Sequence, residues 1–221
     1  VIPQTQLRAL ADMLLAHPEL LVMSDEIYEH LIYGEVAQRS IAAVEPRLKA
    51  RTLVVNGVSK AYAMTGLRIG YAGGPADLVQ AMIRLQSQTT SCANSLAQAA
   101  TVEALNGSQA VVAERRAVMN ERRTYLAERL AKVPGLRVKA PGGAMYFFCD
   151  CRALIGRKTP AGKRIESEGD LVRHLLDEYK LVVIAGGAYG QPGFFRISFA
   201  TSLENLDEGC KRLASACAEL N

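Results

Sequence analysis

The sequence predicts an α/β fold followed by a smaller α+β region, and three observations carry this prediction. Short apolar runs alternate with amphipathic helical segments through the first half of the 221 residues, which is typical of parallel sheets covered by helices. Polar residues such as Asp25 and Asn56 follow the ends of these runs. After Gly135 the strands and helices interleave differently. We therefore expect a mainly parallel sheet in residues 1–112 and a small domain in residues 113–221.

The first half is predicted to contain three strands and three helices. The strands are expected at residues 20–24, 52–56 and 68–73. The helices are expected at residues 4–16, 75–88 and 94–105. The first two strands are all-apolar runs, which are typical of parallel strands buried on both faces. The helices have apolar side chains at helical spacing, and Pro75 and Asn94 suit a first turn and an N-cap.

The second half is predicted to form a smaller α+β domain. A long helix at about residues 108–132 would link it to the first half and end before Gly135. Its strands are expected at residues 136–139, 144–151, 181–184 and 194–199. Its helices are expected at residues 168–179 and 203–219. Phe194, Arg196 and Ser198 would share one face of the last strand, because side chains alternate between the faces of a sheet.

The composition excludes several classes of protein. With 49% hydrophobic and 22% charged residues, the chain is an ordinary globular protein. The net charge of +4 is mild and the basic residues are scattered, so we expect no nucleic-acid binding. No apolar run reaches the ~18 residues of a membrane span, and no signal peptide is visible. We therefore expect a cytoplasmic protein with no membrane partner.

The five cysteines include no C-x-x-C pair. Cys149 and Cys151 would point to the same face of one strand, but none of the three histidines lies near a cysteine in the sequence. A metal site would need at least two further ligands. Reduced, buried thiols are therefore the simpler interpretation, and we expect no metal.

Lys60 lies just beyond the second predicted strand, in a segment of small and hydroxyl residues. A lysine that is partly desolvated there loses its proton more readily and becomes a nucleophile. Arg68 follows eight residues later, between two glycines, and a guanidinium offers a planar fork for phosphate. Both groups suit pyridoxal phosphate, because that cofactor is an aldehyde that carries a phosphate. On its own, Lys60 would also fit an ordinary surface lysine.

Asp25 and Tyr28 follow the first predicted strand. A carboxylate at the end of a buried strand needs a cationic partner or an opening to solvent. Asp25 could pair with the pyridine nitrogen of the cofactor and keep the ring protonated, which makes the ring an electron sink. Tyr28, one helical turn away, could reach the same ligand. The alternatives are a helix N-cap for Asp25 and an ordinary half-buried tyrosine.

Arg196 lies at the centre of an apolar strand. A buried guanidinium is costly unless it has an anionic partner. That partner could be the carboxylate of a substrate, bound through two parallel hydrogen bonds. An internal salt bridge is the alternative.

Three segments resemble the class I aminotransferases, which are fold-type-I pyridoxal phosphate enzymes of the aspartate aminotransferase kind. They are Ser24-Asp-Glu-Ile-Tyr28, Asn56-Gly-Val-Ser-Lys-Ala-Tyr-Ala-Met-Thr-Gly-Leu-Arg-Ile-Gly-Tyr71 and Phe195-Arg-Ile-Ser198. The resemblance covers the whole chain. It implies that residues 1–112 are the C-terminal portion of the cofactor-binding large domain and that residues 113–221 are the small domain.

The resemblance also implies roles for single residues. Lys60 would carry the cofactor as a Schiff base and move the proton between the substrate Cα and C4′ of the cofactor. Asp25 would pair with the pyridine nitrogen and Tyr28 with the phenolic oxygen. Arg68 would bind the phosphate, and Arg196 would bind the α-carboxylate of the substrate.

The chain departs from the family pattern at two positions near Lys60. Many members carry a phosphate-binding serine three residues before the lysine, where this chain has Gly57. Ser59 directly precedes Lys60 and is expected to bind the cofactor. Leu67 replaces a tryptophan that close relatives carry before the arginine.

The resemblance implies a homodimeric aminotransferase that passes the amino group of an amino acid, aspartate or a related one, to a 2-oxo acid. A β-lyase or synthase on the same scaffold is an alternative, and a non-catalytic ligand-binding module is another. The chain begins Val-Ile-Pro, without methionine, at a predicted helix start. We expect it to lack the N-terminal half of the family, and the 221-residue piece alone to be inactive.

Overall fold

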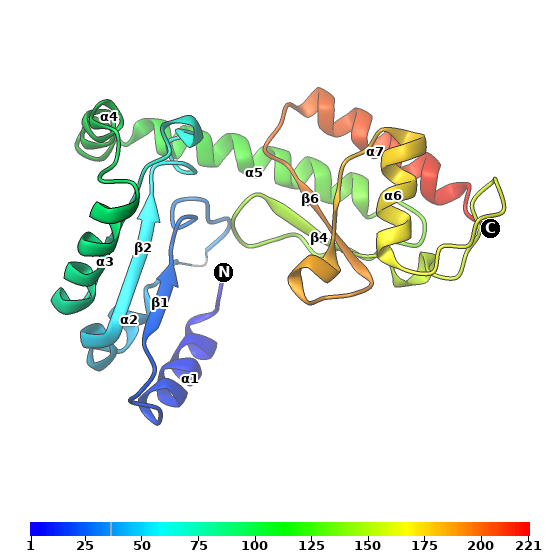
Figure 1. The fold of residues 1–221 in the computed structure, drawn as a ribbon. Helices are drawn as coiled ribbons and strands as arrows, with labels where there is room; N and C mark the ends of the chain where they lie inside the picture. Colours follow the sequence, from blue (N-terminus) through cyan, green and yellow to red (C-terminus); the bar gives the residue numbers. More distant parts are fainter. Residues whose placement is uncertain (36) are drawn as a thin grey trace. The chain divides into compact units, whose positions relative to one another are not determined.

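The computed structural model describes residues 1–35 and 37–221. It divides into two compact units, Val1–Arg116 and Ala117–Asn221 (Figure 1). The boundary between the units falls within helix α5 (Ala110–Leu130). This helix lies where the sequence predicts a long linking helix.

The first unit contains a three-stranded sheet in the order β1-β2-β3. Strand β1 (Val22–Asp25) is parallel to β2 (Thr52–Gly57), and β3 (Gly70–Gly73) is antiparallel to β2. The two parallel strands therefore end at the same edge of the sheet, and β3 begins there. All three strands were predicted, although the third was expected to begin at Arg68.

The sheet is less buried than its apolar sequence predicts. Met23 in β1 is 73% exposed, and no residue of β3 is buried. Burial concentrates on the central strand β2, where Leu53 is 8% exposed. The expectation of a first strand buried on both faces is therefore wrong for this chain. The faces of a strand are buried by helices packed over them, and the described residues leave the face at Met23 uncovered.

The first helices of this unit form a small core beside β1. Helix α1 (Gln4–Leu15) packs with the short helix α2 (Ile41–Val44) and the 3₁₀ turn η1 (Pro46–Arg51). The buried members of this core are Leu7, Ala11, Leu14, Ile41 and Leu48. Arg51 donates hydrogen bonds to the carbonyl oxygens of Leu14 and His17, at the C-terminal end of α1. A cation there satisfies carbonyl groups that have no partner within the helix.

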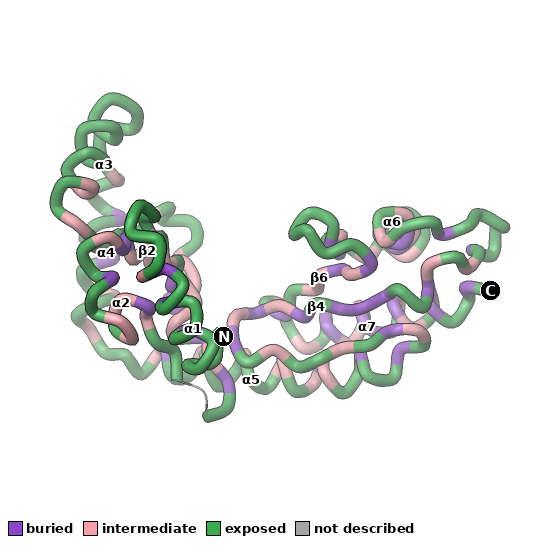
Figure 2. The backbone as a smooth tube through the Cα atoms, turned by 90° about the horizontal axis from the view of Figure 1, so that it is seen from below, coloured by how far each residue is buried: buried purple, intermediate pink, exposed green. Residues whose placement is uncertain are grey.

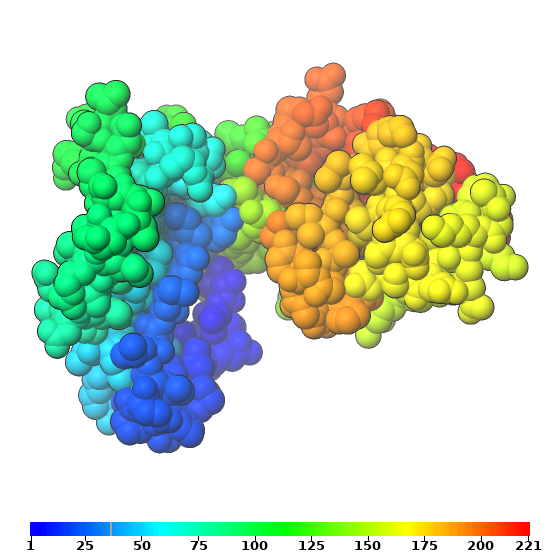
Figure 3. Space-filling view, viewed as in Figure 1, coloured from blue at the N-terminus to red at the C-terminus, as the bar shows by residue number. Residues whose placement is uncertain are grey.

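Helices α3 (Ala76–Thr89) and α4 (Ser95–Asn106) follow β3. The predicted cap is present, because Asn94 Oδ1 accepts hydrogen bonds from the backbone N–H groups of Leu96 (2.9 Å) and Ala97 (3.2 Å). Helix α3 has no buried residue, and Leu85 is 68% exposed. Figure 2 shows α3 as exposed along most of its length, and Figure 3 shows the atoms of this region at the surface.

The second unit contains an antiparallel sheet in the order β4-β6-β5. Its strands are Tyr146–Asp150 (β4), Ile184–Ala185 (β5) and Phe194–Ser198 (β6). Helices α6 (Glu168–Tyr179) and α7 (Leu203–Ala218) complete the unit with the C-terminal part of α5. The strand expected at 136–139 is reduced to one bridge, between Arg137 and Asp150.

One face of this sheet carries the core of the second unit. Phe147, Phe195 and Phe199 are fully buried, and the Phe147 and Phe199 rings meet edge to face with centroids 5.8 Å apart. Phe194 and Arg196 lie on the opposite face and are only partly buried. The alternation predicted for the last strand is therefore present.

Four of the five cysteines are buried and all five are free. Burial raises the pKa of Cys149, Cys151 and Cys217 to about 12 and that of Cys210 to about 11. Cys92 is exposed. The four buried positions agree with the interpretation of the cysteines as packed thiols, whereas for Cys92 the expected burial is wrong.

Asp150 joins two arginines at the end of β4. Arg152 binds its carboxylate through two parallel hydrogen bonds of 2.9 and 2.8 Å, and Arg137 donates a third of 2.8 Å. The hydrogen bonds from Arg152 and then Arg137 hold the pKa of Asp150 well below its usual range. A carboxyl with a lowered pKa stabilises the folded state above its ordinary pKa of about 4, and this contribution is lost as the pH falls through its folded-state pKa.

We expect Asp150→Asn to lower the free energy of unfolding by about 1–2 kcal/mol at pH 7. The variant should also lose less stability than the unmodified chain when the pH falls from 5 to 2. Urea unfolding at several pH values measures both effects. Asp177→Asn, at an exposed position of α6, is the matched control and should change stability by less than about 0.5 kcal/mol. Equal acid sensitivity of Asp150→Asn and the unmodified chain would contradict this role.

Candidate active site

Three of the predicted site residues, Asp25, Lys60 and Arg68, belong to one edge of the first sheet. Asp25 is the last residue of β1 and pairs with Val55 of the parallel strand β2. The segment that carries Lys60 leaves β2 at the same edge. Arg68 precedes β3, which is antiparallel and starts at this edge, with Gly70 opposite Gly57. The carboxyl ends of parallel strands are the usual place for ligands in α/β proteins.

Lys60 and Tyr28 meet at this edge. The Lys60 Nζ atom lies over the Tyr28 ring, 5.9 Å from its centroid. Lys60 is half-buried, and its neighbours Ala61 and Tyr62 are buried against Val112. The backbone at Lys60 is therefore held in place by buried neighbours. An ordinary surface lysine would not need such neighbours.

Asp25 is exposed, and its Oδ1 atom accepts a hydrogen bond from the backbone N–H of Ile27 (3.1 Å). The residues that follow it form a turn rather than a helix. The interpretation of Asp25 as a helix N-cap is therefore wrong, because no helix follows it. Its carboxylate still accepts a backbone N–H two residues later, as an N-cap side chain does. Within residues 1–35 and 37–221, no hydrogen bond to the Oδ2 atom hinders its pairing with a ligand.

Arg68 is exposed and has a left-handed backbone, with φ of 52°. It follows the 3₁₀ turn η2 (Thr65–Leu67), and its Nη1 atom donates to the carbonyl oxygen of Thr65 (3.0 Å). The prediction that Arg68 lies on a strand is wrong, because β3 begins at Gly70. Ser59 is half-buried beside Lys60.

Two further residues connect the segments of this edge, and sequence reasoning missed their role. Asn56 Nδ2 donates a 2.5 Å hydrogen bond to Glu29 Oε1, and Asn56 Oδ1 accepts from the Gly57 N–H (2.8 Å). The first bond ties the turn after β1 to the end of β2. A polar residue at the end of an apolar run was the available signal for Asn56, but Glu29 had none.

The structure accounts for the glycine at position 57. A Cβ atom there would lie 3.0 Å from the carbonyl oxygen of Ile69 and 3.3 Å from Cδ1 of Ile27. Both distances are shorter than an ordinary van der Waals contact. A serine at this position would therefore require β3 to move away from β2.

Arg196 lies on β6 in the second unit. Its Cζ atom lies over the rings of Tyr146 and Tyr189, 4.2 and 4.7 Å from their centroids. Within residues 1–35 and 37–221, no carboxylate forms an ion pair with Arg196. The internal salt bridge considered from the sequence is therefore absent from the described part of the chain.

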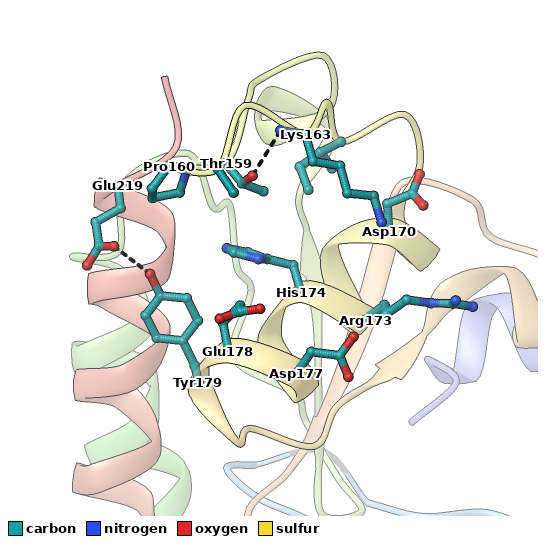
Figure 4. A pocket seen from close by; sticks show the side chains of 12 residues that line it. Thr159, Pro160, Lys163, Asp170, Arg173, His174, Asp177, Glu178, Tyr179 and Glu219 are labelled. Atoms are coloured by element: carbon teal, nitrogen blue, oxygen red, sulfur yellow. Dashed lines mark hydrogen bonds between the residues drawn. The ribbon is translucent and has the colours of Figure 1, made fainter.

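A separate cavity of about 330 Å³ lies in the second unit, beside α6 (Figure 4). His174 lines it, and its Nε2 atom is buried without a hydrogen-bond partner in the described residues. The Tyr179 hydroxyl donates to Glu219 (2.7 Å), and burial together with this carboxylate raises the pKa of Tyr179 to about 12. None of the predicted site residues lines this cavity.

The described residues contain no group of three or more histidine, cysteine, aspartate or glutamate side chains that could hold a metal ion. No helix among them has the length and apolar character needed to cross a membrane.

The family model "Aminotransferase class I and II" matches residues 1–213, so the chain belongs to this family. The aspartate aminotransferase of Rhizobium meliloti is 47% identical over 214 residues, which are 97% of this chain and 52% of that protein. The aspartate/prephenate aminotransferase of Cereibacter sphaeroides is 41% identical over 218 residues, which are 99% of this chain and 54% of that protein. The chain thus spans about half the length of the curated relatives it matches.

The crystal structure of the Rhizobium meliloti aspartate aminotransferase matches with a TM-score of 0.97 and 45% identity, over 100% of this chain and 55% of that one. This confirms the predicted fold class, the C-terminal part of the pyridoxal phosphate transferase fold.

Proposed function

We propose that this chain is part of a pyridoxal 5'-phosphate-dependent aminotransferase that moves an amino group between an amino acid and a 2-oxo acid. The observation that carries the proposal is the pairing of Lys60 with Tyr28 at the sheet edge where Asp25 ends β1. Aspartate or a related amino acid is the proposed donor, because the Rhizobium meliloti relative is named an aspartate aminotransferase. A homodimer in the cytoplasm is the proposed state of the whole protein.

The chemistry of these side chains fits the cofactor. Arg68 is exposed, and in the described part of the chain its guanidinium donates only from Nη1, to a carbonyl oxygen, which leaves donors for a phosphate. Asp25 has an exposed carboxylate for the pyridine nitrogen. Lys60 has no carboxylate partner in the part of the chain that the structure describes. Its amine is therefore available to the aldehyde.

Each residue has a distinct task in the proposed reaction. When bound, the cofactor supplies an electron sink for the charge left at the substrate Cα. Lys60 holds the cofactor and moves the proton to and from that carbon. Asp25 provides the negative charge that keeps a proton on the pyridine nitrogen, and Tyr28 binds the phenolic oxygen. Arg196 binds the substrate carboxylate, which orients the Cα–H bond.

Product analysis tests this proposal against a β-lyase or synthase. A chimera in which residues 1–221 replace the matching part of the Rhizobium meliloti enzyme is incubated with a panel of amino donors. A transaminase forms a new amino acid only when a 2-oxo acid acceptor is present. Release of pyruvate or ammonia without an acceptor would favour the lyase alternative. Binding of amino acids without turnover would favour the non-catalytic module.

Residues 1–221 alone are expected to lack transaminase activity and to bind pyridoxal phosphate weakly. The reason is that the chain matches only 52% of the Rhizobium meliloti enzyme, and the family resemblance places a phosphate loop and a ring-stacking aromatic residue in the other half. Titration of the isolated chain with the cofactor, followed by absorbance, measures the affinity. Saturation at micromolar cofactor would contradict this expectation.

A further inference from the structure

Arg196 is the central residue of an aromatic surface on the second unit. Tyr146 is the first residue of β4, and Tyr189 ends the 3₁₀ turn η4 (Gly186–Tyr189). The Arg196 Cζ atom lies over both rings, at 4.2 and 4.7 Å from their centroids. Residues more than 40 positions apart in the chain therefore converge on one guanidinium.

The two rings are themselves held in place by neighbours. The Tyr189 ring meets Phe148 edge to face, with centroids 6.2 Å apart and planes at 82°. Phe148 in turn stacks on Phe194, at 5.2 Å and 11°. Tyr146 belongs to β4 and is fixed by the sheet, where it pairs with Ser198. The aromatic contacts thus extend along one face of the sheet and restrict the position of the Tyr189 ring.

A second arginine on the same face shows what is unusual about Arg196. Arg152 also lies over an aromatic ring, that of Phe194, at 5.4 Å. Its N–H groups, however, are bound to the Asp150 carboxylate at 2.8 and 2.9 Å. Arg196 has the aromatic contacts but no carboxylate partner among the described residues. Its N–H donors are therefore available for a carboxylate that comes from outside the chain.

We propose that Tyr146 and Tyr189 are positioning residues that hold the Arg196 guanidinium in one orientation for the carboxylate of the substrate. This proposal rests on the proposed function, in which Arg196 binds that carboxylate. The donors of a guanidinium lie in its plane, whereas aromatic rings contact its face. Rings on its face therefore restrict rotation without occupying the donors. Less conformational freedom is lost when the carboxylate binds, and the affinity rises.

The test uses the full 221-residue chain labelled with ¹⁵N-arginine and titrated with succinate, a carboxylate without an amino group. The chemical shift of the Arg196 Nε–Hε signal is expected to change with succinate. The Arg152 signal is expected to stay unchanged, because the Arg152 side chain is already bound to Asp150. Tyr189→Leu removes the ring and should weaken succinate binding about three- to fivefold. Tyr189→Phe keeps the ring and should stay within about twofold of the unmodified chain. The 49% exposure of Tyr189 makes both substitutions compatible with folding, which the amide spectrum checks.

The outcomes separate this proposal from the function on which it rests. If Arg196 responds to succinate and Tyr189→Leu binds it as tightly as the unmodified chain, the positioning role is overturned while the role of Arg196 stands. If Arg196 does not respond to succinate in the unmodified chain, both assignments of Arg196 are overturned. The role of Lys60 is then still decided by borohydride reduction of the bound cofactor and peptide mapping, which need no carboxylate substrate. Tyr146→Leu and Tyr146→Phe repeat the comparison at the second ring.

Discussion

Replacement of Lys60 by alanine is expected to lower kcat of the chimeric aminotransferase by at least ~10⁴-fold. The variant loses both the amine that holds the cofactor and the base that moves the proton. No other described site residue can supply the lost amine. The Tyr28 ring, which lies beside the Lys60 Nζ atom, carries only a hydroxyl. Borohydride reduction followed by peptide mapping provides a second readout. The cofactor label should lie on the Lys60 peptide and disappear in the variant.

Lys49 provides the matched control for this experiment. It is an exposed lysine in η1, on the other side of β2 in the sequence. Lys49→Ala should leave both turnover and labelling unchanged within about twofold. Turnover that persists in Lys60→Ala, or a label on another lysine, would remove Lys60 from its proposed role.

Replacement of Arg196 by alanine is expected to lower kcat/KM by about 10²- to 10³-fold, which corresponds to about 3–4 kcal/mol of lost binding to the substrate carboxylate. The larger part of the effect should appear in KM. Arg196→Lys keeps the charge but loses the two parallel hydrogen bonds, so it should recover only part of the loss.

Arg173, an exposed arginine of α6 in the same unit, is the control for the loss of a positive charge. Arg173→Ala should change kcat/KM by less than about twofold. The same panel should include an amine that lacks the carboxylate. Its slow reaction should be unaffected by Arg196→Ala, because it makes no contact with the guanidinium. Equal losses for both substrates would place the defect of Arg196→Ala in folding instead.

The helices were predictable because their signals are local. Asn94 caps α4 as expected, and the apolar spacing of residues 4–16 fixed α1 to within one residue. The strands were harder to place, because tertiary contacts decide which residues pair. The run 136–139 looks like a strand, yet only Arg137 finds a partner, Asp150. Burial of β1 could not be predicted either, since it depends on which helices pack over its faces.

The sequence proposes a set of candidate site residues, but it does not give their geometry. The predicted strands singled out Asp25, Lys60, Arg68 and Arg196, and the family resemblance then implied a role for each of them. The left-handed turn at Arg68 and the hydrogen bond from Asn56 to Glu29 had no signal in the sequence. The two tyrosine rings at Arg196 had none either, because contacts between distant segments depend on the fold.

The contrast between Cys92 and the four buried cysteines has a practical consequence. Thiolates are the reactive form, and burial raises the pKa of Cys149, Cys151, Cys210 and Cys217 far above neutral pH. A maleimide dye should therefore attach once per folded chain, at Cys92, without any mutagenesis. Cys92 lines the same shallow depression as Tyr71 and Gln86. The fluorescence of the dye would therefore report structural changes next to β3.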